Sequence, residues 1–209
     1  MTAETGGAVP RSVPRALLIV ALAGLLAIAA VAAGRADAAH ADGVPASADG
    51  VQIDVGGSGG GGFLADSYFQ NGVADTNRSG SAGLPNFPRT VSHPIAQEQW
   101  NTFRFLESSY AIPDLTPGAS YQLRLYFLDW YWSKAGQRIF DVAVNGAVVL
   151  KNFDAIQAAA QAGGDGRFIG VERDIDVTAD ATGTVHVDFV RGSADQPLVN
   201  AIVLAPPAP

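Results

Sequence analysis

The stretch Phe127–Gly146 reads FLDWYWSKAGQRIFDVAVNG and decides the fold. It predicts the end of one strand, an aromatic loop and the first arm of a β-hairpin. The pair Asn145-Gly146 lies between apolar runs, and both residues tolerate the positive φ that a tight two-residue turn requires. Before that turn, Phe140, Val142 and Val144 occupy alternate positions, so they are expected on one face of a strand. The stretch therefore predicts antiparallel pairing.

The loop inside this stretch holds three consecutive aromatic residues, Trp130, Tyr131 and Trp132. A strand can bury only every second residue on a given face, so at least one ring is expected to point away from the core. Exposed aromatic rings commonly mark a recognition surface. We interpret Trp130 as a packing residue and expect Tyr131 or Trp132 to line a binding pocket.

The rest of the chain follows the same strand pattern. One helix is expected from Asp154, a good N-cap, through an Ala-rich run to Gly163. A turn is expected at Asn71-Gly72, and a long loop over 73–94. Short alternating strands are expected at 51–55, 120–129, 168–177, 184–190 and 200–204. This pattern predicts an all-β protein, an antiparallel β-sandwich with one short helix.

The N-terminus resembles a secretory signal peptide. An apolar run follows Arg11 and Arg15, and Ala36-Asp37-Ala38 forms a small-x-small site, so residues 1–38 are expected to be removed by cleavage after Ala38. The alternative is an uncleaved membrane anchor over residues 16–34, with the domain outside the membrane. Either reading places the domain in a secreted or extracellular location.

Residues 39–50 are expected to form a linker, 51–205 a single domain and 206–209 a tail. The chain carries a net charge of −7 and no cysteine. The domain must therefore be held by packing and sheet hydrogen bonds without disulfides. The acidic balance argues against nucleic acid and anionic lipid surfaces as partners. We expect a monomer, with a membrane contact only if residues 1–38 are retained.

Several motifs resemble the malectin domain, a carbohydrate-binding β-sandwich. The central one is F-x-D-x-Y-W, a short gap, then G-Q-R-x-F-D-V-x-x-N-G, which lies in 127–146. The looser flanking matches, in chain order, are IDVGG at 53–57, ADSY at 65–68, YAIP at 110–113 and NFD at 152–154. The resemblance spans residues 51–204 and implies a jelly-roll-like sandwich of the galactose-binding type.

The resemblance also implies a site. In this family, loop aromatics and one aspartate at one end of the sandwich grip a glucose-type disaccharide. Matched motif by motif, the expected carbohydrate-binding residues are Tyr68, Phe105, Tyr131, Trp132 and Asp195. Trp100 and Asp66 are possible additions. The family pattern has a tyrosine or a tryptophan where this chain has Phe105, which lacks a hydroxyl. The implied function is a secreted, non-catalytic protein that recognises glucose oligosaccharides or an envelope polysaccharide.

The chemistry of a sugar fits these residue types independently. A pyranose has an apolar C–H face, which flat rings can cover, and a rim of hydroxyls, from which carboxylates and amides can accept hydrogen bonds. Such sites are shallow and solvated, so a dissociation constant of roughly micromolar to millimolar is expected.

Other functions are weaker hypotheses. A glycoside hydrolase needs two carboxylates across a cleft, and no carboxylate here sits in a catalytic motif. The three histidines, His40, His93 and His186, lack paired spacing, so neither a metal nor another cofactor is expected. The glycines of 57–62 match G-x-G-x-x-G, but no amphipathic helix follows, and we interpret them as a loop. The alternative function is a protein-interaction module of the cell surface.

Overall fold

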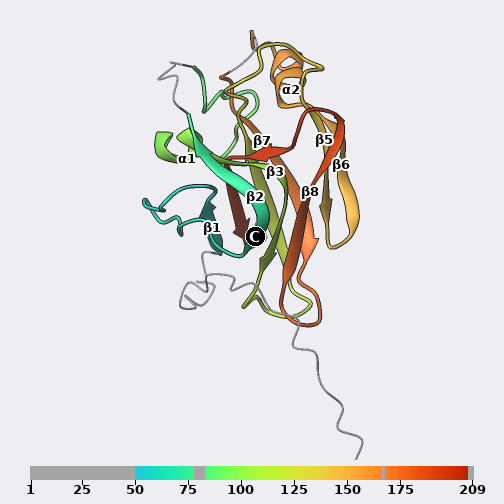
Figure 1. Ribbon diagram of the computed structural model, residues 1–209. Helices are drawn as coiled ribbons and strands as arrows, with labels where there is room; N and C mark the ends of the chain where they lie inside the picture. Colours follow the sequence, from blue (N-terminus) through green and yellow to red (C-terminus); the bar gives the residue numbers. More distant parts are fainter. Residues whose placement is uncertain (1–49, 78–82, 166–167, 207–209) are drawn as a thin grey trace, which may run out of the picture. The chain divides into compact units, whose positions relative to one another are not determined.

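The computed structural model describes residues 50–77, 83–165 and 168–206 (Figure 1). The expected signal peptide and all of the linker except Gly50 lie outside the described residues, and so does the tail after Pro206. Within the described part of the chain, no helix is long and apolar enough to cross a membrane.

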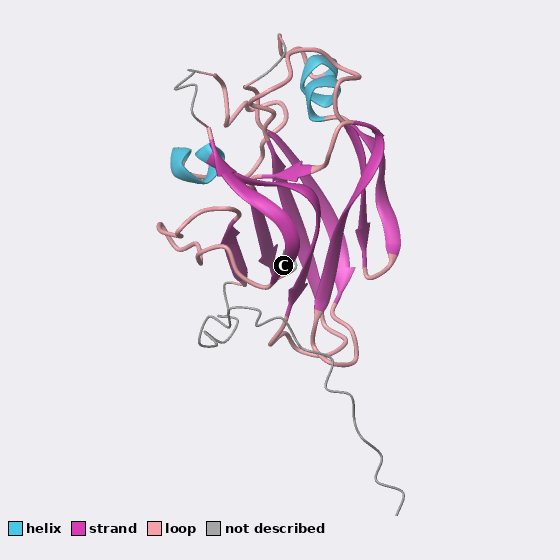
Figure 2. Ribbon diagram, in the orientation of Figure 1, coloured by secondary structure: helices cyan, strands magenta, loops and turns pink. Residues whose placement is uncertain are grey.

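Two antiparallel sheets make up the domain (Figures 1 and 2). The smaller sheet has the order β1-β10-β4-β7 and the larger has the order β2-β3-β8-β5-β6, with β9 paired to β3. The strands are β1 (Val51–Asp54), β2 (Phe69–Thr76), β3 (Thr102–Ile112), β4 (Ser120–Phe127), β5 (Ile139–Val144), β6 (Ala147–Phe153), β7 (Val171–Thr178), β8 (Val185–Ala194), β9 (Leu198–Val199) and β10 (Ala201–Ala205). The helices are α1 (Gln97–Asn101) and α2 (Ala155–Gln161). The predicted antiparallel sandwich is confirmed.

The hairpin that the sequence predicts joins β5 to β6. Val144 pairs with Ala147, and the two turn residues between them have positive φ, 49° at Asn145 and 79° at Gly146. Positive φ at both central positions is the geometry that matches the twist of the flanking strands. The Asn145 side chain also ties the turn to its neighbours, because its Oδ1 accepts from His186 N at 2.9 Å.

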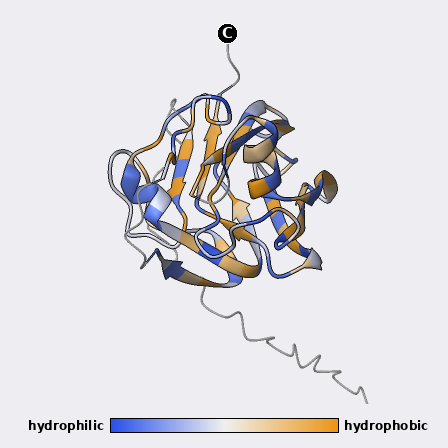
Figure 3. Cartoon of the chain, turned by 90° about the horizontal axis from the view of Figure 1, so that it is seen from above, coloured by the Kyte–Doolittle hydropathy of each residue, from blue (hydrophilic) through white to orange (hydrophobic). Residues whose placement is uncertain are grey.

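The main core lies between the two sheets. Phe140, Val142 and Val144 of β5 are buried in it, as the alternation predicted. Three phenylalanines meet at its centre, with ring centroids 4.6 Å apart for Phe127–Phe153 and 5.5 Å apart for Phe140–Phe153. Hydrophobic and hydrophilic residues alternate along the strands in Figure 3, which is the pattern of strands buried on one face.

A second hydrophobic cluster contains the residues of β4 and β10 that alternate with those of the main core. Tyr126 and Val203 belong to it, and Trp100 packs edge-on against Tyr126 at a centroid distance of 5.6 Å. The segment before β3 supplies Val91 and Ile95 to the same cluster. Both faces of the smaller sheet are therefore covered, one by the larger sheet and one by a long segment of chain.

The structure differs from the sequence prediction in three places, and one of them is the expected loop over 73–94, whose first four residues belong to β2. The expected turn at Asn71-Gly72 is a bulge inside β2, since the pairing with β3 continues to Thr76 while the register shifts between Asn71 and Val73. Both bulge residues have positive φ, so the residue types that favour a turn serve to bend a strand instead. A second short helix, α1, precedes β3, whereas only one helix was expected.

Candidate functional site

The first polar residue of the loop between β4 and β5, Asp129, fixes the backbone of that loop. Asp129 is buried, and its Oδ1 accepts hydrogen bonds from the backbone N–H groups of Tyr131 at 2.9 Å and Trp132 at 2.8 Å. An aspartate whose side chain accepts from the backbone N–H groups two and three residues later stabilises a turn where no helix or strand supplies the hydrogen bonds. The aromatic pair is thus placed by a buried carboxylate.

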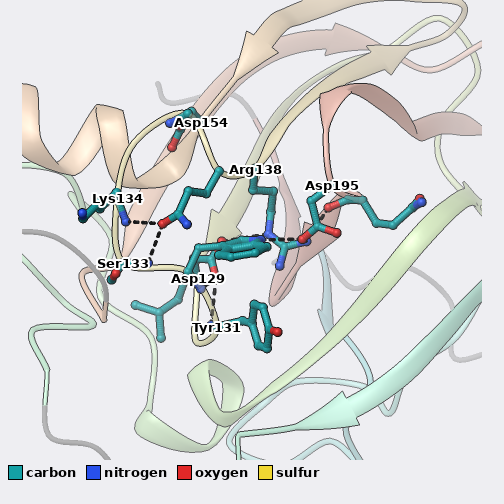
Figure 4. Close-up of polar contacts among 12 residues, drawn as sticks. Asp129, Tyr131, Ser133, Lys134, Arg138, Asp154 and Asp195 are labelled. Atoms are coloured by element: carbon teal, nitrogen blue, oxygen red, sulfur yellow. Dashed lines mark hydrogen bonds and ion pairs between the residues drawn. The ribbon is translucent and has the colours of Figure 1, made fainter.

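A buried arginine joins this loop to the loop after β8. Arg138 donates from Nε to Asp129 Oδ2 at 2.8 Å, and its Nη1 lies 3.0 Å from Asp195 Oδ2. Nη1 also donates to the carbonyl oxygen of Gln196 at 2.5 Å. Figure 4 shows Arg138 between the two aspartates. Charge-assisted contacts of this kind fix geometry strongly when they are shielded from water.

The far end of the loop is anchored to α2. Asp154 is the N-cap of this helix, and its Oδ1 accepts from Gln157 N at 3.0 Å. Its other oxygen accepts from Gly136 N at 2.6 Å, so one carboxylate caps the helix and holds the loop. Gln137 closes the middle of the loop by accepting from Lys134 N at 2.9 Å.

The two aromatic rings stand at right angles to each other. The ring centroids of Tyr131 and Trp132 are 4.7 Å apart with an interplanar angle of 86°. The Trp132 indole Nε1–H donates to Asp195 Oδ2 at 2.6 Å, which holds the ring against the second loop. Tyr131 is 72% exposed, the highest value for a large hydrophobic residue in the described chain.

These side chains form one wall of a cavity of about 400 Å3, here called the aromatic pocket. The lining also includes Phe103 and Phe105, which project from the same face of β3, with ring centroids 6.3 Å apart. The pocket therefore combines four aromatic rings with a small number of charged groups. Its lining residues are Asp75, Phe103, Phe105, Tyr131, Trp132, Arg138 and Asp195.

Of the residues that the sequence pointed to, Phe105, Tyr131, Trp132 and Asp195 line the aromatic pocket together. They come from β3, from the loop after β4 and from the loop after β8, so up to 90 residues of sequence separate them.

Tyr68 lies elsewhere. It precedes β2, and its carbonyl oxygen accepts from Ala111 N near the far end of β3, whereas the pocket uses Phe103 and Phe105 near the beginning. Six strand residues separate Phe105 from Ala111, which is about 20 Å at ~3.3 Å per residue. Burial, and next the charge of Asp114, raise the pKa of the Tyr68 phenol, and Asp114 lies just beyond the far end of β3.

The two possible additions, Asp66 and Trp100, have structural contacts. Asp66 pairs with the buried Arg104 through Nη2 at 2.6 Å and accepts from the Tyr110 hydroxyl at 2.9 Å. Trp100 is fully buried in the second hydrophobic cluster, and its Nε1 donates to Asn86 Oδ1 at 2.9 Å. Neither side chain lines the aromatic pocket.

Three of the lining residues were not predicted from the sequence as binding residues: Asp75, Phe103 and Arg138. Phe103 could have been predicted, because it lies two residues before Phe105 and both side chains must point to the same face if the segment is a strand. Arg138 belongs to the G-Q-R motif, but nothing in the motif says that it faces Asp195. Asp75 fell in a segment that was expected to be a loop, whereas it pairs with Phe103 in the sheet.

Comparison with known proteins gives one family. The model of the malectin domain matches residues 48–202. Malectin-A of Xenopus laevis is 31% identical over 125 residues, which are 56% of this chain and 45% of that protein. The chain thus covers less than half the length of this curated relative.

Solved structures share the fold. The ANXUR1 extracellular domain from Arabidopsis thaliana superposes with a TM-score of 0.61 at 16% identity, over 74% of this chain and 47% of that one. A structure of the plant peptide RALF23 in complex with FER and LLG2 gives a TM-score of 0.57 at 19% identity, over 75% of this chain and 39% of that one. At such low identity the likeness extends to the fold alone.

Proposed function

The chain belongs to the malectin domain family, and we propose that it is a secreted, non-catalytic protein that binds glucose-type di- or oligosaccharides in the aromatic pocket. The observation that carries this proposal is the joint placement of Tyr131, Trp132, Phe105 and Asp195 around one cavity. The family supplies the ligand class, and the residue chemistry of this chain fits it.

Aromatic walls suit the apolar face of a pyranose. Trp132 is held edge-on to Tyr131 and fixed by its hydrogen bond to Asp195, so its orientation is set before a ligand arrives. A preorganised ring loses little conformational entropy on binding, which favours affinity for a small ligand. Phe103 and Phe105 offer further apolar surface and no hydroxyl.

Hydroxyl recognition falls to Asp195. Both of its contacts, from Trp132 Nε1 and Arg138 Nη1, use Oδ2. The carboxylate side chain is 31% exposed, so Oδ1 can accept from a sugar hydroxyl. Arg138 is itself held by Asp129 and Gln196, and it thereby fixes the direction in which Asp195 presents its second oxygen.

These contacts favour binding over catalysis. A glycosidase pair needs one carboxyl group that delivers a proton and a second that acts as a base or nucleophile. Asp195 is bound by a guanidinium and an indole N–H, contacts that employ a carboxylate as an acceptor.

Titration with a panel of glucose disaccharides of different linkages tests the proposal. Of the three tryptophans, Trp100 and Trp130 are buried and only Trp132 lines the pocket, so ligand binding should give saturable fluorescence quenching from Trp132. Calorimetry on Trp132→Ala should show binding lost. Tyr68→Phe is the matched control, because Tyr68 is not among the residues that line the aromatic pocket, and the variant should bind like the parent. Absence of heat and quenching with every glucan would refute the glucose specificity.

A protein-interaction module is the second candidate. The solved complex of RALF23 with FER and LLG2 shares this fold and contains a peptide. The exposed Tyr131 ring could equally serve a protein partner. If no carbohydrate binds but Trp132→Ala abolishes capture of a peptide ligand, this second function takes precedence.

Secretion is part of the proposal and has its own test. Cleavage after Ala38 releases the domain, whereas retention of residues 16–34 anchors it to a membrane. N-terminal sequencing of the protein from its native host distinguishes the two, since a mature chain beginning at Ala39 supports release.

A further inference from the structure

Outside the aromatic pocket, three side chains with metal-binding atoms converge on the smaller sheet. They are His93, Glu172 and Asp174, and their ligand atoms all lie within 4.8 Å of one another. Glu172 and Asp174 are two residues apart on β7 and therefore share a face of the sheet. His93 comes from the segment that covers this face, 79 residues earlier in the chain.

Glu172 is the fixed member of the group. Its side chain is 3% exposed, and its Oε2 accepts from Ser92 N at 2.6 Å and His93 N at 2.8 Å. These two bonds orient the carboxylate so that Oε1 lies 2.6 Å from His93 Nδ1. The Tyr126 hydroxyl stands 3.5 Å from the same oxygen and donates to the His93 carbonyl at 3.0 Å. Outer contacts of this type hold ligands in place in metal sites.

Charged groups of both signs surround the three side chains. Arg124 of β4 lies opposite Asp174 in the sheet register and is the positive neighbour on that side. Its Nε and Nη2 donate to Gln122 Oε1, at 3.0 and 2.7 Å. Arg89 and Arg173 line the adjoining hollow together with Ser92 and Glu172, so a divalent ion would be held by direct coordination to the three side chains rather than by the net charge of this face.

The ligand types select among cations. One imidazole nitrogen with two carboxylate oxygens is a set that zinc accepts at bond lengths of about 2.0–2.2 Å, with water in the remaining position. Calcium and magnesium prefer oxygen ligands alone. Zinc would need the three ligand atoms closer together. The side chain of His93 is 43% exposed and that of Asp174 is also exposed, so changes of rotamer at the surface would bring them inward once the contact between His93 Nδ1 and Glu172 is exchanged for the metal.

We propose that His93, Glu172 and Asp174 form a zinc-class binding site that ties the covering segment to β7. The segment already meets this strand through Glu172 N, which donates to Thr90 O at 2.8 Å. A metal ion would add to this link and to the contacts of the Glu172 carboxylate with Ser92 and His93, next to the cluster of Trp100 and Tyr126. Because the site is open to solvent, the zinc affinity should be moderate, with a dissociation constant on the order of micromolar.

Thermal unfolding of the purified full chain, stripped with a chelator and then titrated with ZnCl2, tests the site. A ligand that binds only the folded state raises the melting temperature. Zinc is expected to raise it by several degrees in the parent and to leave His93→Gln and Asp174→Asn unshifted. His186→Gln is the matched control, because His186 lies 3.5 Å from a single carboxylate, Asp180, and its loss should leave the zinc effect intact.

Cobalt absorption provides a second readout that does not depend on stability. Co2+ bound by a nitrogen and two oxygens from the protein gives visible bands, which should appear with the parent and disappear with His93→Gln. An equal zinc shift in all variants, cobalt bands that survive in His93→Gln, or no response to zinc at all would overturn the site. A calcium effect as large as that of zinc would overturn the assignment of metal class.

Discussion

The indole nitrogen of Trp132 donates a hydrogen bond of 2.6 Å to Oδ2 of Asp195, across 63 residues of sequence. This bond joins the loop that follows β4 to the loop that follows β8, and Arg138 reinforces it from behind at 3.0 Å. The aromatic wall and the acceptor of the pocket are therefore a single connected unit. Substitutions in either loop should therefore change both the free energy of unfolding and the affinity for the ligand.

Trp132→Phe should separate the contribution of the hydrogen bond to ligand affinity from the contribution of the aromatic ring. The phenyl ring retains apolar contact with a sugar, but Asp195 loses a donor, and a net loss of about 1 kcal/mol corresponds to a fivefold to tenfold weaker affinity. Trp132→Ala also removes the ring, so a further loss of about tenfold is expected. Calorimetric titration measures both. Equal affinities for the two variants would show that the ring itself contributes nothing.

Arg138→Gln should destabilise the domain by about 3 kcal/mol, because it leaves the buried Asp129 without its cationic partner. Urea denaturation monitored by circular dichroism gives the free energy of unfolding. Arg191→Gln makes the same change of charge at an exposed position of β8 and should stay within about 0.5 kcal/mol of the parent. A comparable loss in both variants would mean that net charge, not the buried pair, matters.

Asp154→Ala should act at two places at once. Loss of the N-cap costs about 1 kcal/mol, and loss of the contact to Gly136 N frees the aromatic loop. Amide hydrogen exchange should therefore accelerate at Gly136 as well as at Gln157. The control Gln157→Ala keeps the backbone donor and alters only an exposed side chain. Unchanged exchange at Gly136 would disprove the link between the helix cap and the loop.

Phe105→Tyr should strengthen glucose binding. The substitution adds a phenol hydroxyl to the lining of the pocket, and one added hydrogen bond of about 1 kcal/mol gives roughly fivefold tighter binding. Phe87→Tyr is a suitable comparison, because Phe87 packs against the main core and does not line the pocket. An affinity that falls in Phe105→Tyr would indicate a ligand whose apolar face occupies this position.

The buried tyrosines predict a loss of stability at high pH. Burial, together with the nearby Asp66 and Glu172 carboxylates, raises the pKa of Tyr110 and Tyr126 above the ordinary value. Above pH ~10 the unfolded state loses these two protons and the folded state keeps them, so the free energy of unfolding falls as pH rises. In a titration of absorbance at 295 nm, both phenols should ionise only as circular dichroism reports unfolding.

Tyr110→Phe and Tyr126→Phe should each remove part of that late absorbance step. Ionisation of all five tyrosines while the circular dichroism spectrum stays native would contradict the assignment.

Sequence alone determined the class of fold and the position of the hairpin. The alternation of Phe140, Val142 and Val144 and the Asn145-Gly146 turn are local signals, and local chemistry suffices to decide them. The same holds for α2, whose N-cap Asp154 was readable from residue type. The prediction of a turn at Asn71-Gly72 was wrong, because residues that tolerate positive φ are equally suited to a turn and to a strand bulge. Only the pairing with β3 distinguishes the two.

Tertiary structure decided which residues meet. Asp195 is 63 residues from Trp132 in sequence, and no local pattern predicts that Arg138 contacts Asp195. These contacts depend on how two loops lie at one end of the sandwich. The same is true of His93 and Glu172, whose 79-residue separation gives no metal-site spacing. Strand alternation fixes which face a residue occupies, but the end of the sheet at which it lies follows from strand order, which local sequence does not encode.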